Sequence, residues 1–303
     1  MATAREIHRH MKSVKNIGQI TKAMKMVAAA RLRRAQERAA ASRPYAIKIK
    51  EVLSNIVGDK GTLSGLNPRK HPLIQKRPVK KIGFLVMCSD KGLAGAYGSN
   101  VLKHAMGEIL KVKGEVVIIT CGRRARDFFR HRGFNVIQAH FGFSDKPSYN
   151  NAVEVAYDAA QRFADEQFDE LRIVYTLFKS ALSQTPTNET VLPLEPPADE
   201  APKGGEAQVK ANTQYLFMPE AEEILADLAP RYLETVIYAA LVQSAASELG
   251  SRMTAMSSAT DNAAKLVKSL EQSLELNYNK ARQALITREL TEICGGAEAL
   301  KQN

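Results

Sequence analysis

The N-terminal segment constrains the fold most, because it combines helix-forming composition with coiled-coil spacing. Residues 2–57 contain one proline, Pro44, and one interior glycine, Gly18, and are rich in Ala, Lys, Arg, Met and Gln, all good helix formers. Their seam positions step by three and four, which predicts a long helix paired lengthwise with another and kinked or broken at the proline. Much of this seam is small, so we expect close approach of the partner with few large buried side chains. The seam positions are Ile7, Met11, Val14, Gly18, Thr21, Met24, Ala28, Leu32, Ala35, Ala39, Ser42, Ala46, Ile49, Leu53 and Ile56.

A second long helical pattern runs from Pro219 to about Leu300, and its seam is also small and partly polar. Two such segments at opposite ends of the chain predict an antiparallel helix pair with the intervening residues inserted as a domain. Since neither seam has the apolar stripe of a self-sufficient coiled coil, we expect a larger partner to help enclose the pair. The predicted C-terminal seam is Tyr232, Val236, Ala239, Gln243, Ala246, Gly250, Met253, Ser257, Thr260, Ala264, Val267, Glu271, Leu274, Tyr278, Ala281 and Leu285.

The inserted segment has the alternating pattern of an α/β domain. Short apolar runs predict buried strands, and helical stretches lie between them, which indicates a parallel-type sheet with crossover helices. The sequence leaves the strand order open. The strands are expected at 81–87, 115–120, 135–141 and 171–178, and the helices near 98–113, 122–132 and 148–167.

Composition marks the remaining segments and the domain boundaries. A Gly- and Pro-containing stretch indicates a loop, and a Pro-, Gly- and charge-rich excursion indicates a mobile segment before a candidate last strand. The loop is 58–72, the excursion 195–213 and the candidate strand 214–218. The predicted domains are an N-terminal helix at 1–57, a globular domain at 58–218 and a C-terminal helix at 219–303.

The net charge is concentrated at one end of the chain. Residues 1–50 hold 13 Lys/Arg against 2 Asp/Glu, and the rest of the chain holds 30 of each, so the whole excess of +11 lies on the N-terminal helix. A segment of this charge binds nucleic acid, an anionic membrane or an acidic protein surface, or it is simply a solvated helix face. The Arg-rich start superficially resembles a mitochondrial transit peptide, but the pattern continues unbroken into the helix.

Cysteine and histidine usage gives no sign of a disulfide framework or a metal site. The 3 Cys contain no Cys-x-x-Cys pair, and the 6 His lack metal-ligand spacing. A reducing compartment is the simplest interpretation. No run approaches the roughly 18 apolar residues that a membrane-spanning helix needs.

The turn "SDKGLAGAYGSN" (Ser89 to Asn100) follows an apolar strand, as glycine-rich turns do in many nucleotide-binding domains. Its glycines, Gly92, Gly95 and Gly98, are three apart. That spacing matches neither the dinucleotide-binding nor the P-loop fingerprint. We therefore expect the glycines to allow a tight strand-to-helix turn and close packing.

The neighbourhood of the turn offers no convincing catalytic group. Asp90 beside Lys91 suggests an ion pair within the turn, and Cys88 ends an apolar strand, which favours a buried thiol over a nucleophile. A dinucleotide fold would place an acid after its second strand. Here that strand is followed by Arg123 and Arg124, which would suit only a 2′-phosphate.

Two functions of other classes stay open on the residues alone. A basic coiled-coil protein could bind DNA or RNA, although its N-terminal helix has almost no aromatic residues and its charge is spread. A dinucleotide-dependent enzyme could use the α/β segment, although the glycine spacing and the acid are missing. Steep salt dependence would mark the first, and saturable binding of NAD(P) or ATP the second.

Three segments together resemble the gamma subunit family of the rotary, proton-driven ATP synthase. They are "ITKAMKMVAAARLRRAQERAAASRPYA" (Ile20 to Ala46), the turn "SDKGLAGAYGSN", and "MSSATDNAAKLVKSLEQSLELNYNKARQALITRELTEICGGAEAL" (Met256 to Leu300). The resemblance covers essentially the whole chain in order. It implies a fold in which an antiparallel coiled coil of long N- and C-terminal helices carries an inserted Rossmann-like α/β domain.

The resemblance also implies a function and its partners. The helix pair would stand inside a ring of alpha and beta subunits, and the globular domain would sit on the membrane ring of c subunits beside epsilon. Proton flow would turn this rotor, one copy per complex, and drive the beta sites through ATP synthesis, or ATP hydrolysis would drive the reverse. The chain itself would hold no catalytic residue, cofactor or metal and bind no nucleic acid, as a peripheral protein on the cytoplasmic side of a bacterial plasma membrane.

Individual positions follow from the same motifs. Asp90, Gly92 and Gly95 would form a structural turn that binds no nucleotide. The excursion at 195–213 departs from the family pattern, and Cys88 and Cys121 lack the spacing of a regulatory cysteine pair, so no thiol control is expected. On their residue types alone, the contact positions are ordinary seam packing or a solvated helix face. The expected contacts with the beta subunit are Met24, Lys25, Arg282, Gln283, Thr287 and Glu289, with Arg288 less strongly indicated.

Overall fold

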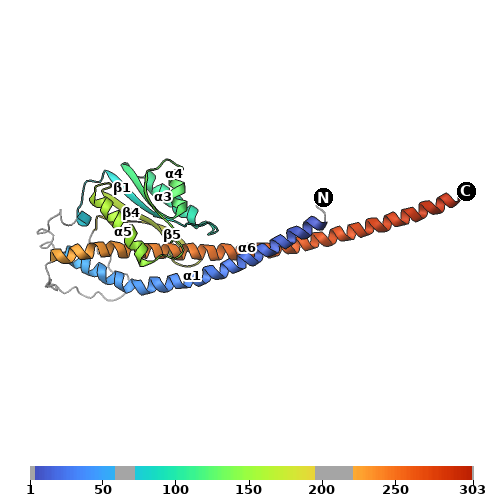
Figure 1. Ribbon diagram of the computed structural model, residues 1–303, viewed down its shortest axis with the longest axis horizontal. Coiled ribbons are helices and arrows are strands. Elements are labelled where there is room, and N and C mark those ends of the chain that lie inside the picture. Colours follow the sequence, from blue (N-terminus) through green and yellow to red (C-terminus); the bar gives the residue numbers. More distant parts are fainter. Residues whose placement is uncertain (1–3, 59–71, 195–220, 302–303) are drawn as a thin grey trace. The chain divides into compact units, whose positions relative to one another are not determined.

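The computed structural model describes residues 4–58, 72–194 and 221–301, and these form two compact units (Figure 1). One, here called the paired-helix unit, comprises Met1–Val27 and Thr254–Asn303, and the other, the α/β unit, comprises Ala28–Met253. Helix α1 (Ala4–Gly58) and helix α6 (Ala221–Lys301) each contribute to both units. The excursion at 195–213 and the candidate strand at 214–218 lie outside the described residues. So does the expected loop at 58–72, except for its end residues Gly58 and Pro72, which are helical.

The α/β unit is built on a five-stranded sheet of order β3-β2-β1-β4-β5. The first four strands are parallel, and β5 runs antiparallel to β4. All four predicted strands are confirmed, whereas β5 was not predicted from the sequence. The strands are β1 (Lys81–Met87), β2 (Glu115–Cys121), β3 (Val136–His140), β4 (Glu170–Phe178) and β5 (Gln184–Leu192).

Helices cover both faces of this sheet. Successive residues of β1 alternate between two apolar clusters, Phe84 and Val86 lying on one face and Leu85 and Met87 on the other. Helices α3 and α4 cover the first face, and α5 and α6 cover the second (Figure 1). The crossover helices are α3 (Tyr97–Leu110), α4 (Arg123–Arg130) and α5 (Tyr149–Ala164), and a short 3-10 turn, η1, spans Pro72–Ile74.

Within the α/β unit, α6 is a core helix rather than a weak seam. Leu233 and Ile237 are fully buried against the sheet, and Leu241 is 4% exposed. The predicted seam took their neighbours Tyr232 and Val236, which are only partly buried. The prediction was wrong by one residue here because α6 has two neighbours, the sheet and α1, and its most buried face points at the sheet.

Helix α1 packs against α6 in the same unit along the predicted N-terminal seam. Leu32 meets Ala246 and Leu249, and Leu53 meets Leu225, which is the order of an antiparallel pair. The helix continues through Pro44, which excludes a break there and leaves the kink as the alternative. Every buried residue of α1 among those described belongs to the predicted seam, which is confirmed.

The paired-helix unit is a close antiparallel contact of small residues. A Cβ on Gly18 would lie 3.4 Å from the Cβ of Ala263. The Thr21 and Thr260 hydroxyls form a hydrogen bond of 2.8 Å across the pair. Four of the seven seam positions predicted between 254 and 278 are shifted by one residue. These four, Ser257, Ala264, Glu271 and Tyr278, are more exposed than the neighbours that replace them in the observed seam. That seam is Met256, Thr260, Ala263, Val267, Leu270, Leu274 and Asn277.

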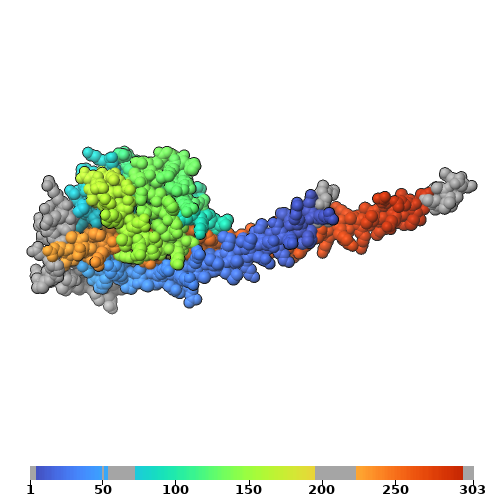
Figure 2. Space-filling model, viewed as in Figure 1, coloured from blue at the N-terminus to red at the C-terminus, as the bar shows by residue number. Residues whose placement is uncertain are grey.

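Helix α6 continues past the part that α1 can cover. The pairing of Gly18 with Ala263 and of Thr21 with Thr260 places the first described residue of α1, Ala4, opposite about Asn277. Beyond that point every residue from 281 to 295 is exposed. Figure 2 shows this red end of α6 continuing beyond the blue end of α1. No described helix is both long and apolar enough to cross a membrane.

Candidate functional site

The glycine-rich turn lies at the edge of the sheet where a nucleotide would be expected. The strand order reverses between β1 and β4, and in open α/β sheets ligands bind at the carboxyl ends of the strands beside such a reversal. The turn follows β1 at this edge and leads into α3. What occupies the edge therefore decides whether the chain binds a nucleotide.

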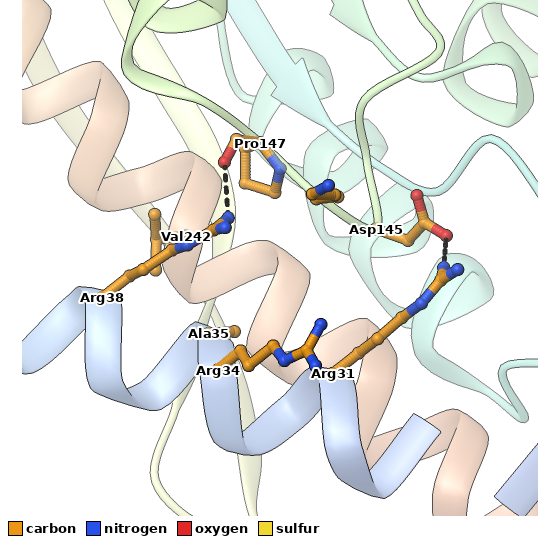
Figure 3. Close-up of a pocket in the computed structure, with 8 residues that line it drawn as sticks. Arg31, Arg34, Ala35, Arg38, Asp145, Pro147 and Val242 are labelled. Atoms are coloured by element: carbon orange, nitrogen blue, oxygen red, sulfur yellow. Dashed lines mark hydrogen bonds and ion pairs between the residues drawn. The ribbon is translucent and has the colours of Figure 1, made fainter. Parts of the chain in front are cut away.

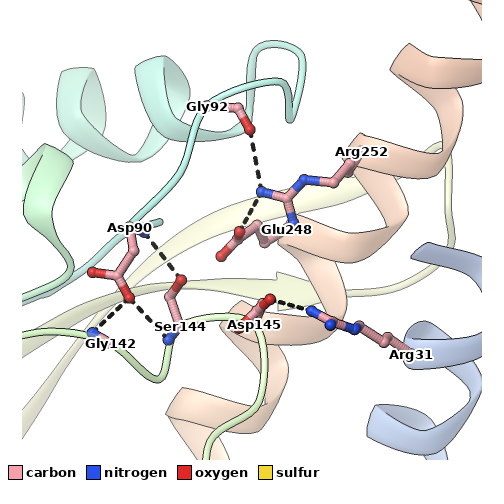
Figure 4. A network of polar contacts seen from close by, with 8 residues as sticks. All are labelled: Arg31, Asp90, Gly92, Gly142, Ser144, Asp145, Glu248 and Arg252. Carbon is pink, nitrogen blue, oxygen red and sulfur yellow. Dashed lines mark hydrogen bonds and ion pairs between the residues drawn. The ribbon is translucent and has the colours of Figure 1, made fainter. Parts of the chain in front are cut away.

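The carboxylate of Asp90 fills the position at the start of α4. It accepts hydrogen bonds from the backbone N–H groups of Arg123 at 3.1 Å, Gly142 at 2.8 Å and Ser144 at 3.2 Å. Figure 4 shows the contacts with Gly142 and Ser144. Helix N-termini of this kind bind phosphate in nucleotide-binding folds. The chain supplies its own anion there, and Asp90 does not form the expected ion pair with Lys91.

Helix α6 closes the same edge with a buried ion pair. Arg252 lies 2.6 Å from the carboxylate of Glu248, whose side chain is 1% exposed, and also donates a hydrogen bond of 3.2 Å to the carbonyl of Gly92 in the turn (Figure 4). Burial raises the pKa of Glu248, and the charge and hydrogen bond of Arg252 act in the opposite direction. The pair ties α6 to the turn.

The space left at this edge is too small for a nucleotide. The cavity beside Asp90, Gly122 and Glu248 measures about 10 Å³, room for about one water molecule, whereas ligand pockets span about 300–1,000 Å³. Arg123, considered above for a 2′-phosphate, stacks on Phe141 with its guanidinium 5.4 Å from the ring centre. The geometry gives the dinucleotide-enzyme alternative no binding site at this edge.

The glycines of the turn differ in what they do. Gly95 has a φ of +54°, which a tight turn requires and glycine adopts without strain. A Cβ on Gly92 would meet no atom within 4 Å, so the expected close packing is not found there, and Gly92 contributes its carbonyl to Arg252 instead. Cys88 is buried as predicted, and burial raises the pKa of its thiol to about 11.

In the paired-helix unit, Met24 and Lys25 occupy different environments. Met24 is partly buried in the seam, and Lys25 is exposed and donates a hydrogen bond of 2.9 Å from its ammonium to the hydroxyl of Ser257. Lys25 is thus anchored across the pair rather than freely mobile. The exchange of one exposed hydrogen bond for another costs little, which leaves this ammonium available to a partner.

The predicted C-terminal contact residues lie together on the uncovered end of α6. Arg282, Gln283, Thr287 and Glu289 are all exposed. The Thr287 hydroxyl donates to the Gln283 carbonyl at 2.9 Å within the helix. The same segment exposes large apolar side chains that the sequence analysis did not single out as contacts, although Leu285 stood in its seam. These side chains are Leu285, Ile286, Leu290 and Ile293, between 49% and 67% exposed.

The structure does not bring the two groups of predicted contacts together. Lys25 bonds to Ser257, and Arg282 lies twenty-five residues farther along α6, which is about 38 Å of helix at about 1.5 Å per residue. The predicted contact residues therefore lie in two separate regions of the paired-helix unit. In the ranges that the structure describes, no three His, Cys, Asp or Glu side chains are grouped as metal ligands.

Comparison with known proteins gives one consistent family. A family model described as ATP synthase matches residues 3–300. The ATP synthase gamma chain of Brevibacillus brevis is 47% identical over 298 residues, covering 97% of this chain and 98% of that protein. The gamma chain of Desulfitobacterium hafniense is 42% identical over 301 residues, covering 99% of this chain and 100% of that protein.

Solved structures share the fold at lower identity. A chain of the Euglena gracilis mitochondrial ATP synthase rotor is 18% identical, with a TM-score of 0.58 over 93% of this chain and 98% of that one. A chain of the Tetrahymena thermophila central stalk and c-ring is 22% identical, with a TM-score of 0.57 over 79% of this chain and 99% of that one. With a matching family model over nearly all its length and relatives above 40% identity, this chain belongs to the ATP synthase gamma chain family.

Proposed function

We propose that this chain is the central-stalk rotor subunit of a proton-driven F-type ATP synthase. In this role it couples proton flow to ATP synthesis, or ATP hydrolysis to proton pumping, by turning inside a ring of alpha and beta subunits. It is a non-catalytic subunit, because the chemistry takes place at the beta sites. The observation that carries the proposal is the near full-length similarity to gamma chains of two bacteria.

The exposure of the uncovered end of α6 supports the proposal that partner subunits enclose it. Residues 281–295 are all exposed, and the segment alternates charged residues with large apolar ones. Exposed apolar clusters of this kind mark interaction surfaces. We assign Arg282, Gln283, Thr287 and Glu289, with Arg288, to contacts with the beta subunits at this end.

The second contact region is the basic face of α1. Met24 and Lys25 meet the beta subunits there, where an acidic surface complements the excess positive charge of residues 1–50. Exposed ion pairs are worth only about 0–1 kcal/mol each. They can therefore break and re-form as the rotor turns, and no single rotor position lies in a deep free-energy minimum. Many such weak contacts bias the beta subunits between their conformations as the rotor turns.

The assembly and its location follow from the same role. One copy of the chain joins alpha, beta and epsilon subunits and the c-ring, touching the membrane only through that ring, on the cytoplasmic side of a bacterial plasma membrane. The rotor's helices at 1–57 and 219–303 form the shaft, and 58–218 form the globular domain that meets epsilon and the c-ring. It needs neither a cofactor nor nucleic acid.

Reconstitution tests this proposal. The full-length chain is mixed with cognate alpha and beta subunits, and complex formation and azide-sensitive ATPase activity are compared with those of alpha plus beta alone. We expect a complex with one copy of the chain and raised activity. If a folded chain and competent partners give no complex, the rotor role is refuted. A titration with NAD(P) and ATP then tests the enzyme alternative.

A further inference from the structure

A second cavity, away from the glycine-rich turn, lies in the α/β unit between α1 and the segment that leads into α5 (Figure 3). Its volume is about 140 Å³. A single water needs roughly 10–15 Å³ of such volume, so the cavity has room for a small polyatomic ion.

The cavity wall carries a strong excess of positive charge. Arg31, Arg34 and Arg38 line it from α1, and Lys146 lines it from the facing segment, whereas Asp145 is the one acid among the lining residues. The arginines are three and four residues apart and share one helix face. Like charges at this spacing destabilise a helix by about 0.2–0.5 kcal/mol per pair, so an anion in the cavity would relieve a repulsion that the chain only partly offsets.

Two of the arginines already hold the cavity open. Arg31 forms an ion pair with Asp145, and Arg38 donates a hydrogen bond of 3.3 Å to the carbonyl of Pro147. In Figure 3 both side chains reach across to the facing segment, whereas Arg34 stays on the α1 side. That segment is fixed at its end by a capping box, in which the Ser148 hydroxyl accepts the N–H of Asn151.

Arg34 is the one arginine of the cavity lining without a partner among the described residues. Among the described residues its guanidinium has no hydrogen bond or ion pair, and it lines the cavity between its two engaged neighbours. A guanidinium presents a planar fork of donors that matches the oxygens of phosphate. We propose that this cavity binds a small tetrahedral oxyanion, represented by inorganic phosphate, with Arg34 as the principal ligand. The bound anion would join α1 to the entry of α5, and the proposal does not depend on the rotor function.

The test measures phosphate binding to the full-length chain. Inorganic phosphate is titrated at constant pH and ionic strength, and binding is followed by ³¹P line broadening and by the thermal unfolding temperature. We expect saturable binding with a dissociation constant on the order of 1 mM or tighter. Arg34→Gln should weaken it about tenfold, the loss expected for one charge-assisted hydrogen bond.

Arg33→Gln is the matched control. Arg33 is the adjacent residue, carries the same charge and is 83% exposed in a pair with Glu37 outside the cavity lining. Equal weakening by both variants would mean that phosphate responds only to net charge, which overturns the site. Absence of saturable binding to the unaltered chain overturns it as well.

A competition experiment with ATP distinguishes free phosphate from the terminal phosphate of a nucleotide as the ligand. If the ligand is the free ion, ATP should compete with phosphate no better than an equal concentration of sulfate does. Displacement of phosphate by much lower ATP concentrations, lost in Arg34→Gln, would show that the terminal phosphate of a nucleotide is the ligand and would overturn the assignment to a free oxyanion.

Discussion

Replacing Arg252 with methionine should destabilise the α/β unit far more than an ordinary ion-pair deletion. The change leaves the carboxylate of Glu248, which is 1% exposed, without the guanidinium that lies 2.6 Å away. It also removes the hydrogen bond of 3.2 Å to the carbonyl of Gly92. Breaking one side of a buried pair costs about 3–5 kcal/mol, which corresponds to a fall of roughly 6–20 °C in the unfolding temperature of a unit this large.

The effect should depend on pH, with a definite sign. Burial already raises the pKa of Glu248, and losing Arg252 removes an opposing cause, so the folded-state pKa rises further. Because the folded state then holds its proton more tightly than the unfolded chain, stability falls as pH rises from about 4.3, the ordinary value for glutamate. The deficit of Arg252→Met should therefore be smaller at acidic pH than at pH 8.

Calorimetric unfolding of the full-length chain measures this, with two comparisons. Arg288→Met makes the same change in the same helix at an exposed pair with Glu292, 2.9 Å apart, and should cost at most about 0.5 kcal/mol. The double variant Glu248→Leu with Arg252→Met removes both charges and should be more stable than Arg252→Met alone. If the double variant is the less stable of the two, or if the deficit does not change with pH, the argument from an uncompensated buried charge is wrong.

Three further outcomes are expected. Met24→Lys places an ammonium in the partly buried seam, beside the exposed Lys25. In the reconstituted enzyme it should lower proton pumping per ATP hydrolysed more than it lowers hydrolysis itself, and an unchanged ratio would contradict the proposed contact region on α1. Gly122→Ala should lower the free energy of unfolding by more than about 3 kcal/mol. Gly122 has a φ of +109°, and a new Cβ there would lie 2.2 Å from the Cys88 carbonyl oxygen. The control Gly133→Ala, at a φ of +76° with no atom within 4 Å of the new Cβ, should show only the backbone strain of about 1–2 kcal/mol. A thiol reagent at pH 8 should modify Cys294 alone in the isolated folded chain, since the other two thiols are buried and burial raises their pKa values; rapid modification of all three before denaturation would refute that burial.

The α1 seam could be predicted because α1 packs along a single stripe. Every buried residue described in α1 falls on a predicted seam position, and seven of the fifteen seam positions are alanine, glycine, serine or threonine. Helix α6 is harder to predict, because in the α/β unit it contacts both the sheet and α1. In the paired-helix unit, small residues such as Ser257 and Ala264 fit either of two registers that share three of their seven positions. Spacing alone could not choose between these registers, and only packing does.

The edge strand and the buried ion pair were missed for related reasons. Strand β5 reads "QTPTNETVL", a polar sequence with a proline at 186, which an edge strand tolerates because it pairs on one side only. Glu248 and Arg252 are four residues apart, the spacing of a common surface pair on a helix. Only the fold reveals that this pair lies at the strand reversal, where its charges are removed from water.

The carboxylate of Asp90 competes, from within the α/β unit, with any phosphate for the backbone N–H groups at the start of α4. A tethered group acts at an effective concentration in the millimolar range even on a flexible linker, and higher when it is held rigidly. An anion held by three backbone N–H groups is therefore not displaced by nucleotide in solution. In the rotor role proposed above, this edge of the sheet gives the chain no direct means of sensing the ratio of ATP to ADP, so nucleotide state would reach the turn through the force that neighbouring subunits exert.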